Sequence, residues 1–246
     1  MAGLSWLIER PVAHRGLHGN GTIENTLGAA EAAAAARYAI EVDLQLTADN
    51  EVVVFHDDTL HRLTEAKGPL ATRKLAELKE LPVGRTSERI PTLQELLDLV
   101  AGRTPLVLEL KSDWNGDERL SQRTAEVLKD YSGPVAGMSF DPQILMALQK
   151  YAPGLPRGIV AERYYDDPEW SVATRRQKFS LGNLLHIPRT KPHFVAYSVR
   201  DLPAFAPLLA RHLLGMKLLT WTVRTAPERK KAGLWANQMI FEGFLP

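Results

Sequence analysis

The chain has no cysteine in its 246 residues. This absence excludes disulfide bridges, thiolate metal sites and cysteine nucleophiles, and it is compatible with a reducing compartment. An excess of one charge is lacking too, since 30 basic residues stand against 29 acidic ones and the formal net charge is +1. That balance gives no electrostatic reason to expect a nucleic-acid partner or an anionic membrane surface.

Long hydrophobic runs are also missing. No stretch of the sequence approaches the ~20 uninterrupted apolar residues that a membrane-spanning helix needs. The N-terminal segment has no basic region and reaches Glu9 before an apolar stretch forms, so we do not expect a signal peptide. We expect a cytoplasmic protein without stable membrane insertion, and the sequence leaves its oligomeric state open.

What the sequence does contain is a regular alternation of strand and helix patterns. The first expected strand begins at Pro11, and the others cover 40–46, 105–110, 135–140, 156–161, 194–198, 217–223 and 238–241. The expected helices cover 24–38, 91–101, 118–131, 142–151, about 168–185, 202–214 and 227–234. Eight such units predict an α/β fold, a closed (β/α)8 TIM barrel, with residues 1–246 in one domain. An open doubly wound sheet is the alternative, but the chain has no GxGxxG motif or P-loop.

Two segments depart from the simple alternation. Residues 51–55 form a short apolar run after the turn signal Thr47-Ala-Asp-Asn, so we expect an extra strand that pairs with 40–46 as a hairpin. Residues 59–89 are polar and are interrupted by glycine and proline, with one short helical piece near 72–81. This segment is too long for a plain loop and too short for a domain, so we expect a small lid inserted after the second strand.

Polar side chains collect at the ends of the first three expected strands, where the functional groups of barrel enzymes lie. Glu41 and Asp43 point to one face of the second strand, and Glu109 and Lys111 have the same spacing on the third. The other candidates lie at or near strand ends and are His14, Arg15, His56, Phe140 and Trp221.

The chemistry of these side chains suggests one kind of site. Three carboxylates in a partly enclosed site repel one another unless a cation lies among them. Oxygen ligands without a thiol suit a hard ion, so we expect one divalent cation, Mg²⁺ or Ca²⁺. Two histidines suit a general acid and base near neutral pH. Arg15 and Lys111 suit an anionic substrate, for which phosphate is the natural candidate. The combination predicts metal-assisted phosphoryl transfer.

Each candidate also has an ordinary structural explanation. The alternating Glu41 and Asp43 can belong to an exposed strand face, and His14 can be a hydrogen-bonded core histidine. Glu109 and Lys111 can form a structural ion pair, and the residues after strand 51–55 can be a polar turn. Their occurrence together at one rim favours a functional site. The other histidines and most tryptophans are expected to be structural, surface, packing or lid residues: His18, His61, His186, His193, His212, Trp6, Trp114, Trp170 and Trp235.

Several short motifs follow one another along the chain. They are His14-Arg-Gly, Glu24-Asn-Thr, Glu41-Val-Asp-Leu-Gln-Leu-Thr, Val53-Val-Phe-His-Asp, Leu60-His-Arg-Leu-Thr, Ile90-Pro-Thr-Leu-Gln-Glu-Leu, Glu109-Leu-Lys, Ser139-Phe and Trp221-Thr-Val. In this order they resemble the glycerophosphodiester phosphodiesterase family from about residue 11 to the C-terminus. The resemblance implies a TIM-type barrel with a small insertion after the second strand.

The resemblance also implies a role for each candidate. Glu41, Asp43 and Glu109 match the ligands of a divalent metal, His14 and His56 match an acid–base pair, and Arg15 and Lys111 match phosphate contacts; we expect Phe140 and Trp221 to form an apolar wall for the glycerol part. In the implied reaction one histidine deprotonates the glycerol 2-hydroxyl, which attacks phosphorus, and the other protonates the leaving alcohol. Water then opens the cyclic phosphate to give sn-glycerol 3-phosphate.

Two positions near the C-terminus depart from the family pattern. Arg224 follows Trp221-Thr-Val where the family often has Asn. The last strand reads Asn237-Gln-Met-Ile-Phe-Glu-Gly where the family often ends Asp-Gly-Ile-Ile-Thr-Asp. We expect neither departure to touch the metal or the histidines, and we expect Arg224 to affect the substrate end of the pocket.

The expected function is metal-dependent hydrolysis of a small-molecule glycerophosphodiester. A lysophospholipase D-like enzyme acting on monoacyl lipids is the alternative within the class, and a wide apolar groove beside the metal would favour it. A catalytically silent barrel that binds phosphodiesters is the alternative from another class. It predicts a missing metal or acid–base residue, and none is missing. A nucleic-acid phosphodiesterase would want the basic surface that this chain lacks.

Overall fold

Eight parallel strands close into a barrel in the computed structural model, which describes residues 4–165, 170 and 173–246. The barrel closes because β1 pairs with β2 on one side and with β9 on the other. In order around the barrel the strands are β1 (Val12–Ala13), β2 (Ala39–Leu46), β4 (Leu106–Leu110), β5 (Val135–Ser139), β6 (Arg157–Ala161), β7 (Phe194–Ser198), β8 (Lys217–Val223) and β9 (Gln238–Phe241). The closed barrel is confirmed and the open sheet is wrong.

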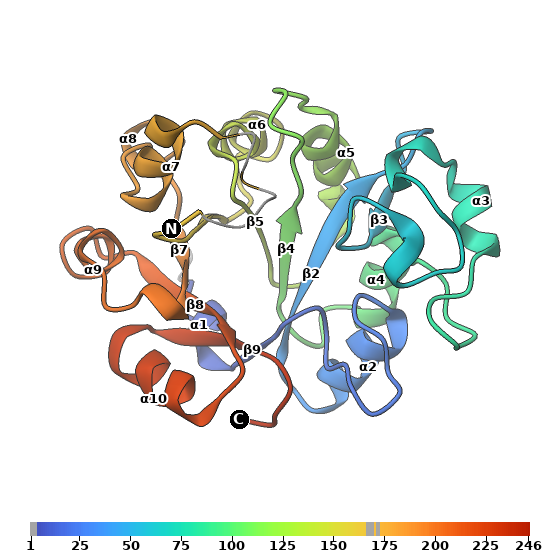
Figure 1. The fold of residues 1–246 in the computed structure, drawn as a ribbon, viewed down its shortest axis with the longest axis horizontal. Helices are drawn as coiled ribbons and strands as arrows, with labels where there is room; N and C mark the ends of the chain where they lie inside the picture. Colours follow the sequence, from blue (N-terminus) through green and yellow to red (C-terminus); the bar gives the residue numbers. More distant parts are fainter. Residues whose placement is uncertain (1–3, 166–169, 171–172) are drawn as a thin grey trace.

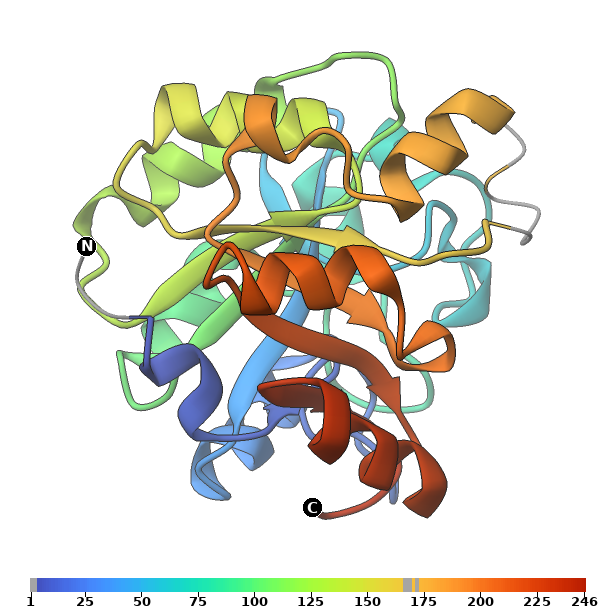
Figure 2. The same ribbon diagram turned by 90° about the vertical axis from the view of Figure 1, so that its left-hand side faces the viewer.

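The helices lie around the outside of the strands (Figure 1). Turning the molecule by 90° shows the first helix near one end of the barrel and the last helices along its side (Figure 2). The helices are α1 (Trp6–Glu9), α2 (Leu27–Ala35), α3 (Leu75–Glu80), α4 (Leu93–Val100), α5 (Arg119–Val127), α6 (Pro142–Tyr151), α7 (Arg175–Gly182), α8 (Ile187–Thr190), α9 (Phe205–His212) and α10 (Ala226–Trp235). Among residues 4–165, 170 and 173–246, none of the helices has the length and apolar composition needed to cross a membrane.

Strand β4 illustrates how the sequence fills two cores at once. Successive side chains of a strand point to opposite faces. Val107 packs in the barrel interior with Met138 and Ile240, whereas Leu106 and Leu108 pack against the surrounding helices. All five residues of β4 are buried, as expected for a parallel strand covered on both faces. The barrel interior is therefore packed with hydrophobic side chains, which form a floor beneath the polar side chains at the C-terminal (upper) ends of the strands.

Helix α2 is the alanine-rich helix that the sequence predicts, although it is shorter than 24–38. It begins at Leu27 because the Thr26 hydroxyl accepts a hydrogen bond from the backbone N–H of Ala29 at 3.2 Å. Four of its alanines are buried, and small side chains let the helix lie close to the strands. The predicted helix at about 168–185 is present as α7 over Arg175–Gly182, where Thr174 is the N-cap and Asn183 the C-cap; residues 168, 169, 171 and 172 of the predicted range lie outside the described residues. Helices α1 and α8 were not predicted.

The segment between β3 (Val52–Val54) and α4 forms the predicted insertion. Strand β3 runs antiparallel to β2, so the hairpin expectation is confirmed. The insertion projects from one side of the barrel at the right of Figure 1. It contains two 3-10 turns (Leu60–Arg62 and Leu70–Thr72) and α3. Its small core consists of Val53, Phe55, Leu60, Leu70, Leu78, Val83 and Ile90.

The fold makes one prediction about pH and stability, which concerns His186 at the start of α8. Burial lowers the pKa of His186 to about 4, from an ordinary value of 6.5. Between these values the unfolded chain binds more protons than the folded one, so lowering the pH through this window destabilises the fold. The His186 contribution lost by pH 4 is on the order of 3 kcal/mol. Urea unfolding of the wild type and of His186→Asn from pH 7 to 4 measures it. The variant should lose less stability, and identical pH profiles would contradict the assignment.

Candidate active site

Two neighbouring strands bring three carboxylates together at the upper end of the barrel. The register of β2 and β4 places Asp43 opposite Glu109, and Glu41 lies two residues before Asp43 on the same face. These side chains belong to residues that are only 1 to 8% exposed. One carboxylate oxygen from each residue lies within 4.8 Å of one from each of the others. The predicted convergence of the three acids is therefore present, and the exposed-strand explanation is wrong.

Two cations and an amide hold the central carboxylate, Asp43. Lys111 Nζ lies 2.8 Å from Asp43 Oδ1 and 2.8 Å from Glu109 Oε1. Arg15 Nε lies 3.3 Å from Asp43 Oδ2, and the side-chain amide of Asn25 donates to the same oxygen at 2.9 Å. Burial alone would raise the pKa of Asp43, but Lys111 and the neighbouring positive groups hold it far below its ordinary value. Asp43 is therefore a carboxylate at neutral pH.

Glu41 differs from Asp43 in that burial and repulsion outweigh the groups that stabilise its charge. Its Oε2 accepts a hydrogen bond from the backbone N–H of Arg15 at 2.9 Å, but its buried Oε1 has no hydrogen-bond partner among the described residues. Burial, together with the charges of Asp43 and Glu109, raises the pKa of Glu41 well above its ordinary value. A buried carboxylate oxygen without a donor is costly unless a cation contacts it. The three acids, with oxygen ligands only, thus fit a hard divalent cation.

His14 follows β1 and faces these acids. Its Nε2 lies 4.0 Å from Glu41 Oε2, and its Nδ1 lies 2.8 Å from Glu242 Oε2. The hydrogen bond with His14 lowers the pKa of Glu242 to about 2. An ionised carboxylate only accepts hydrogen bonds, so Nδ1 of His14 carries the proton and Nε2 is left as the basic nitrogen facing the acids. Burial outweighs Glu242 and lowers the pKa of His14.

A tight turn after His14 sets this geometry. Gly16 has φ +80°, and a Cβ at this position would lie 2.8 Å from the backbone and side chain of Ala29 in α2. The backbone N–H of Gly16 donates to the carbonyl of Glu41 at 3.1 Å. Glycine is therefore required where the chain turns from β1 toward α2, with Arg15 left facing Asp43.

The two departures near the C-terminus do contact the site, so the expectation that neither touches a histidine is wrong. Glu242 follows β9, which pairs with β1, and barrel closure brings it beside His14 although 228 residues separate them. Arg224 Nη2 lies 2.8 Å from the same Glu242 oxygen. The two departures thus form one ion pair that contacts His14 through Glu242, and Arg224 also lines the site cavity, so the expectation that it affects the substrate end stays a prediction.

His56 is held by a second set of contacts that begins in the insertion. Its Nδ1 lies 2.8 Å from Asp57 Oδ1. Arg62 from the insertion donates to Asp57 and also to Glu24, with the closest contacts at 2.6 and 2.7 Å. The Gln45 side chain donates to the carbonyls of Phe55 and Asp57, both at 2.9 Å. Burial alone would raise the pKa of Asp57, but Arg62 and His56 lower it to about 2. The insertion therefore orients the second histidine.

All nine predicted site residues line one cavity of about 690 Å³. Phe140 and Trp221 pack edge to face with ring centroids 5.4 Å apart and an interplanar angle of 84°. Trp170 packs on Phe140 at 5.0 Å, and Trp114 packs on Trp170 at 5.9 Å. Trp114 and Trp170 also line the cavity, so these packing residues form part of its wall. Sequence reasoning gave no site role to Glu24, Asn25, Asp57, Arg62 or Glu242, because each acts through a contact with a residue distant in sequence or with a neighbouring side chain.

Comparison with known proteins gives a consistent result. The Glycerophosphoryl diester phosphodiesterase family matches residues 14–245. A glycerophosphodiester phosphodiesterase of Caldanaerobacter subterraneus is 33% identical over 180 residues, which cover 69% of this chain and 73% of that protein. A solved phosphodiesterase of Oleispira antarctica, in complex with the product sn-glycerol-3-phosphate, has a TM-score of 0.80 and 24% identity and covers 96% of this chain and 93% of its own. A solved protein of Silicibacter pomeroyi, described as a putative glycerophosphoryl diester phosphodiesterase, has a TM-score of 0.78 and 26% identity over 94% of this chain and 89% of its own.

The buried acids predict opposite responses to one substitution with and without metal. Glu41→Gln removes one of three repelling carboxylates and supplies an N–H donor at the unpartnered position. In a chelator, the variant should be more stable than the wild type by about 1 kcal/mol, or ~2–4 °C in Tm. Added Mg²⁺ or Ca²⁺ should raise the Tm of the wild type but not that of Glu41→Gln. Thermal unfolding measures both effects, and an equal metal-induced shift in the two proteins would remove Glu41 from the metal site.

Proposed function

The chain belongs to the glycerophosphoryl diester phosphodiesterase family, and we propose that it hydrolyses glycerophosphodiesters to sn-glycerol 3-phosphate and an alcohol with one divalent cation bound. One observation carries the proposal. Glu41, whose buried Oε1 has no hydrogen-bond partner among the described residues, lies beside the carboxylates of Asp43 and Glu109 in the lining of a cavity that His14 and His56 also line. Such a site combines the ligands of a hard cation with two groups that exchange protons near neutral pH.

Glu41, Asp43 and Glu109 would hold the cation. When bound, Mg²⁺ or Ca²⁺ would draw negative charge off the phosphodiester and stabilise the charge that develops during attack on phosphorus. The carboxylates belong to adjacent strands with fixed register, so their separation is set by the barrel rather than by mobile loops. Rigid placement of this kind favours a ligand set that is ready before substrate binds.

Arg15 and Lys111 would bind the phosphate oxygens. Both side chains line the cavity, and both already contact Asp43. Burial would lower the pKa of Lys111, but Asp43 and Glu109 raise it above its ordinary value, so it stays an ammonium. Two fixed cations beside a phosphodiester select an anionic substrate and balance its charge in the transition state.

His14 and His56 would move the protons. One histidine takes the proton of the glycerol 2-hydroxyl, whose oxygen attacks phosphorus, and the other gives a proton to the oxygen of the leaving alcohol. The five-membered cyclic phosphate then reacts with water, and the two histidines exchange roles to give sn-glycerol 3-phosphate. Each imidazole has its Nδ1 within 2.8 Å of a carboxylate, from Glu242 or Asp57, which would keep Nε2 directed at the substrate.

Phe140 and Trp221 would contact the apolar edge of the glycerol part. The Trp221 indole N–H donates to the carbonyl of Ala196 at 3.1 Å, which fixes the orientation of the ring at the cavity wall. A rigid aromatic face excludes water from the glycerol carbons without competing for the phosphate.

The aromatic wall also supports a second candidate, hydrolysis of monoacyl lysophospholipids. From Phe140 the wall continues through Trp170 to Trp114, and these rings line the same cavity as the carboxylates. A surface of this kind can contact an acyl chain as well as a small head group. Lysophosphatidylcholine would test this alternative beside the smaller substrate.

The proposed reaction predicts a requirement for the substrate's own hydroxyl. Metal-stripped protein should release glycerol 3-phosphate from glycerophosphocholine only after Mg²⁺ or Ca²⁺ is added. A matched diester without the 2-hydroxyl should not react, because the internal nucleophile is missing. Equal rates on both diesters would reject the cyclic intermediate but leave the proposed role of the metal standing. Inactivity on glycerophosphocholine and on lysophosphatidylcholine would reject the enzymatic proposal and favour a phosphodiester-binding barrel.

The acid–base assignment predicts large rate losses in single variants. His14→Ala and His56→Ala should each lower kcat by about 10²–10⁴-fold, the usual contribution of a positioned acid or base. His212→Ala is the matched control, since His212 is exposed at the end of α9, and it should keep the wild-type rate. Circular dichroism would establish that the variants are folded. A rate near that of the wild type for His14→Ala or His56→Ala would exclude that histidine from the chemistry.

A further inference from the structure

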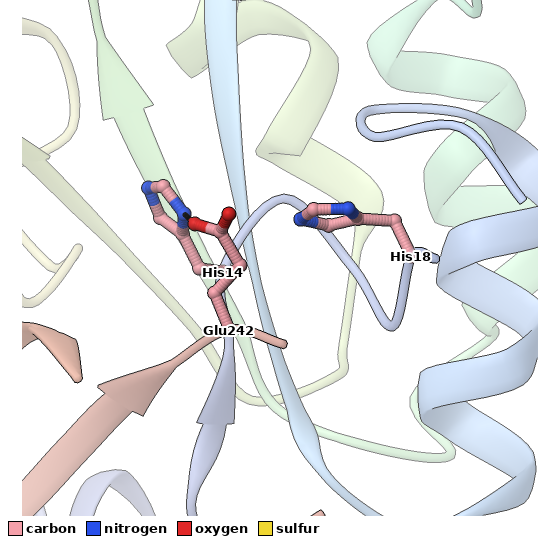
Figure 3. Close-up of side chains that lie close together, drawn as sticks. All are labelled: His14, His18 and Glu242. Atoms are coloured by element: carbon pink, nitrogen blue, oxygen red, sulfur yellow. Dashed lines mark hydrogen bonds and ion pairs between the residues drawn. The ribbon is translucent and has the colours of Figure 1, made fainter. Parts of the chain in front are cut away.

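A second cluster of metal-ligating side chains adjoins the first and has a different chemistry. It consists of His14, His18 and Glu242, each of which offers one ligand atom within 4.8 Å of those of the other two. Figure 3 shows His18 directing the edge of its ring toward the paired His14 and Glu242 side chains. The three residues come from the β1–α2 connection and from the end of β9, which barrel closure places side by side.

His18 is the member that the proposed reaction does not use. Its Nε2 is buried and has no hydrogen-bond partner in the part of the chain that the structure describes. The backbone on either side of it is anchored: Leu17 donates to the carbonyl of Ala29 at 2.9 Å, and Gly19 exchanges two backbone hydrogen bonds with Thr22. A buried ring nitrogen without a partner is costly, and here it is held beside an imidazole and a carboxylate, two groups of the kinds that ligate metals in proteins.

We propose that His14, His18 and Glu242 form a separate site for Zn²⁺ or a similar transition metal. Two imidazoles and one carboxylate form a common zinc ligand set, with the fourth position left to water. Nitrogen ligands favour transition metals over Mg²⁺ and Ca²⁺, whereas the oxygen-only cluster of Glu41, Asp43 and Glu109 favours the hard ions. The two adjacent sites therefore differ in the metals they select.

The geometry requires only a small adjustment. Zinc–ligand bonds of ~2.0–2.2 Å place tetrahedral ligand atoms about 3.4 Å apart. His14 Nδ1 and Glu242 Oε2 are 2.8 Å apart, and the three ligand atoms lie within 4.8 Å of one another, so His18 would approach the other two by on the order of 1 Å. Arg224 Nη2 lies 2.8 Å from Glu242 Oε2, so its positive charge competes with a metal for this carboxylate. The Arg224 side chain is 47% exposed and can turn into solvent. Removing that competing cation should strengthen the site.

Metal at this site would inhibit the reaction, a consequence that rests on the proposed role of His14. Because an ionised Glu242 can only accept, we place the His14 ring proton on Nδ1, which lies 2.8 Å from Glu242 Oε2. A metal bound at Nδ1 displaces that proton, and the neutral ring then carries its single proton on Nε2. The nitrogen that faces Glu41 would change from proton acceptor to donor, so His14 would be fixed in the wrong tautomer.

Binding can be measured without any activity, using Co²⁺ as a spectroscopic probe of nitrogen ligands. The full-length protein saturated with Mg²⁺ is titrated with Co²⁺, and Zn²⁺ is then added as a competitor. We expect one Co²⁺ per chain with visible bands that Zn²⁺ abolishes. His18→Asn should weaken binding at least tenfold, Arg224→Asn should strengthen it about threefold to tenfold, and the control His212→Asn should leave it unchanged. No Co²⁺ binding, or equal binding by the wild type and His18→Asn, would overturn the proposal.

Inhibition separates this site from the carboxylate site. Each protein is assayed with Mg²⁺ and increasing Zn²⁺, relative to its own rate without zinc. The second site is supported if the wild type is inhibited at a Zn²⁺ concentration at least tenfold lower than the concentration that inhibits His18→Asn. If the same Zn²⁺ concentration inhibits both proteins, zinc acts at the carboxylates and the proposal is refuted. Where Co²⁺ binds through His18 but no diester is hydrolysed, the metal site stands and the proposed function fails. Imidazole ¹⁵N NMR of the wild type provides a check independent of variants, since His14 and His18 signals must both shift with Zn²⁺.

Discussion

The interaction on which the site depends is the burial of Asp43 between opposite charges. A carboxylate that is 2% exposed is unstable by itself, and Lys111, Arg15 and Asn25 compensate for its burial. These partners come from the β1–α2 connection and from the end of β4, so the charge balance joins both segments to β2 at one point. Glu41 lies beside this balanced group and is left with an unpartnered oxygen, which is why the site has room for one more positive charge. The hydrophobic floor and the cluster of carboxylates above it both follow from this one arrangement of strands.

Closure of the barrel determines how the His14 ring is oriented. It places Glu242, near the C-terminus, against His14, near the N-terminus, and in doing so it determines which ring nitrogen carries the proton. The insertion has a similar effect on the other side, where Arg62 holds Asp57 and Asp57 holds His56. Each histidine thus depends on a carboxylate, and each carboxylate on an arginine. The two sets of contacts differ in origin. The contacts of His14 arise from closure of the barrel, and those of His56 arise from the insertion.

The sequence alone predicts the features that depend on local pattern. Strand–helix alternation indicated eight βα units, and the spacing of Glu41 with Asp43 and of Glu109 with Lys111 indicated a shared face; both follow from backbone periodicity. It did not predict that Glu242 and Arg224 act on His14, because that contact joins residues 228 positions apart and depends on strand pairing rather than on spacing. The position of His18 was missed for the same reason, since a histidine in a loop has no periodicity to interpret. The helix ends were displaced by a few residues where capping side chains such as Thr26 begin the helix later than the apolar pattern does.

The most direct test of the central claim is a crystal structure of the protein with Mn²⁺ and sn-glycerol 3-phosphate, with anomalous data collected to locate the metal. This account predicts an anomalous peak within about 2.5 Å of an oxygen of Glu41, Asp43 and Glu109, with the phosphate contacting Arg15 and Lys111. No peak at these three carboxylates, or a phosphate bound away from both cations, would contradict it.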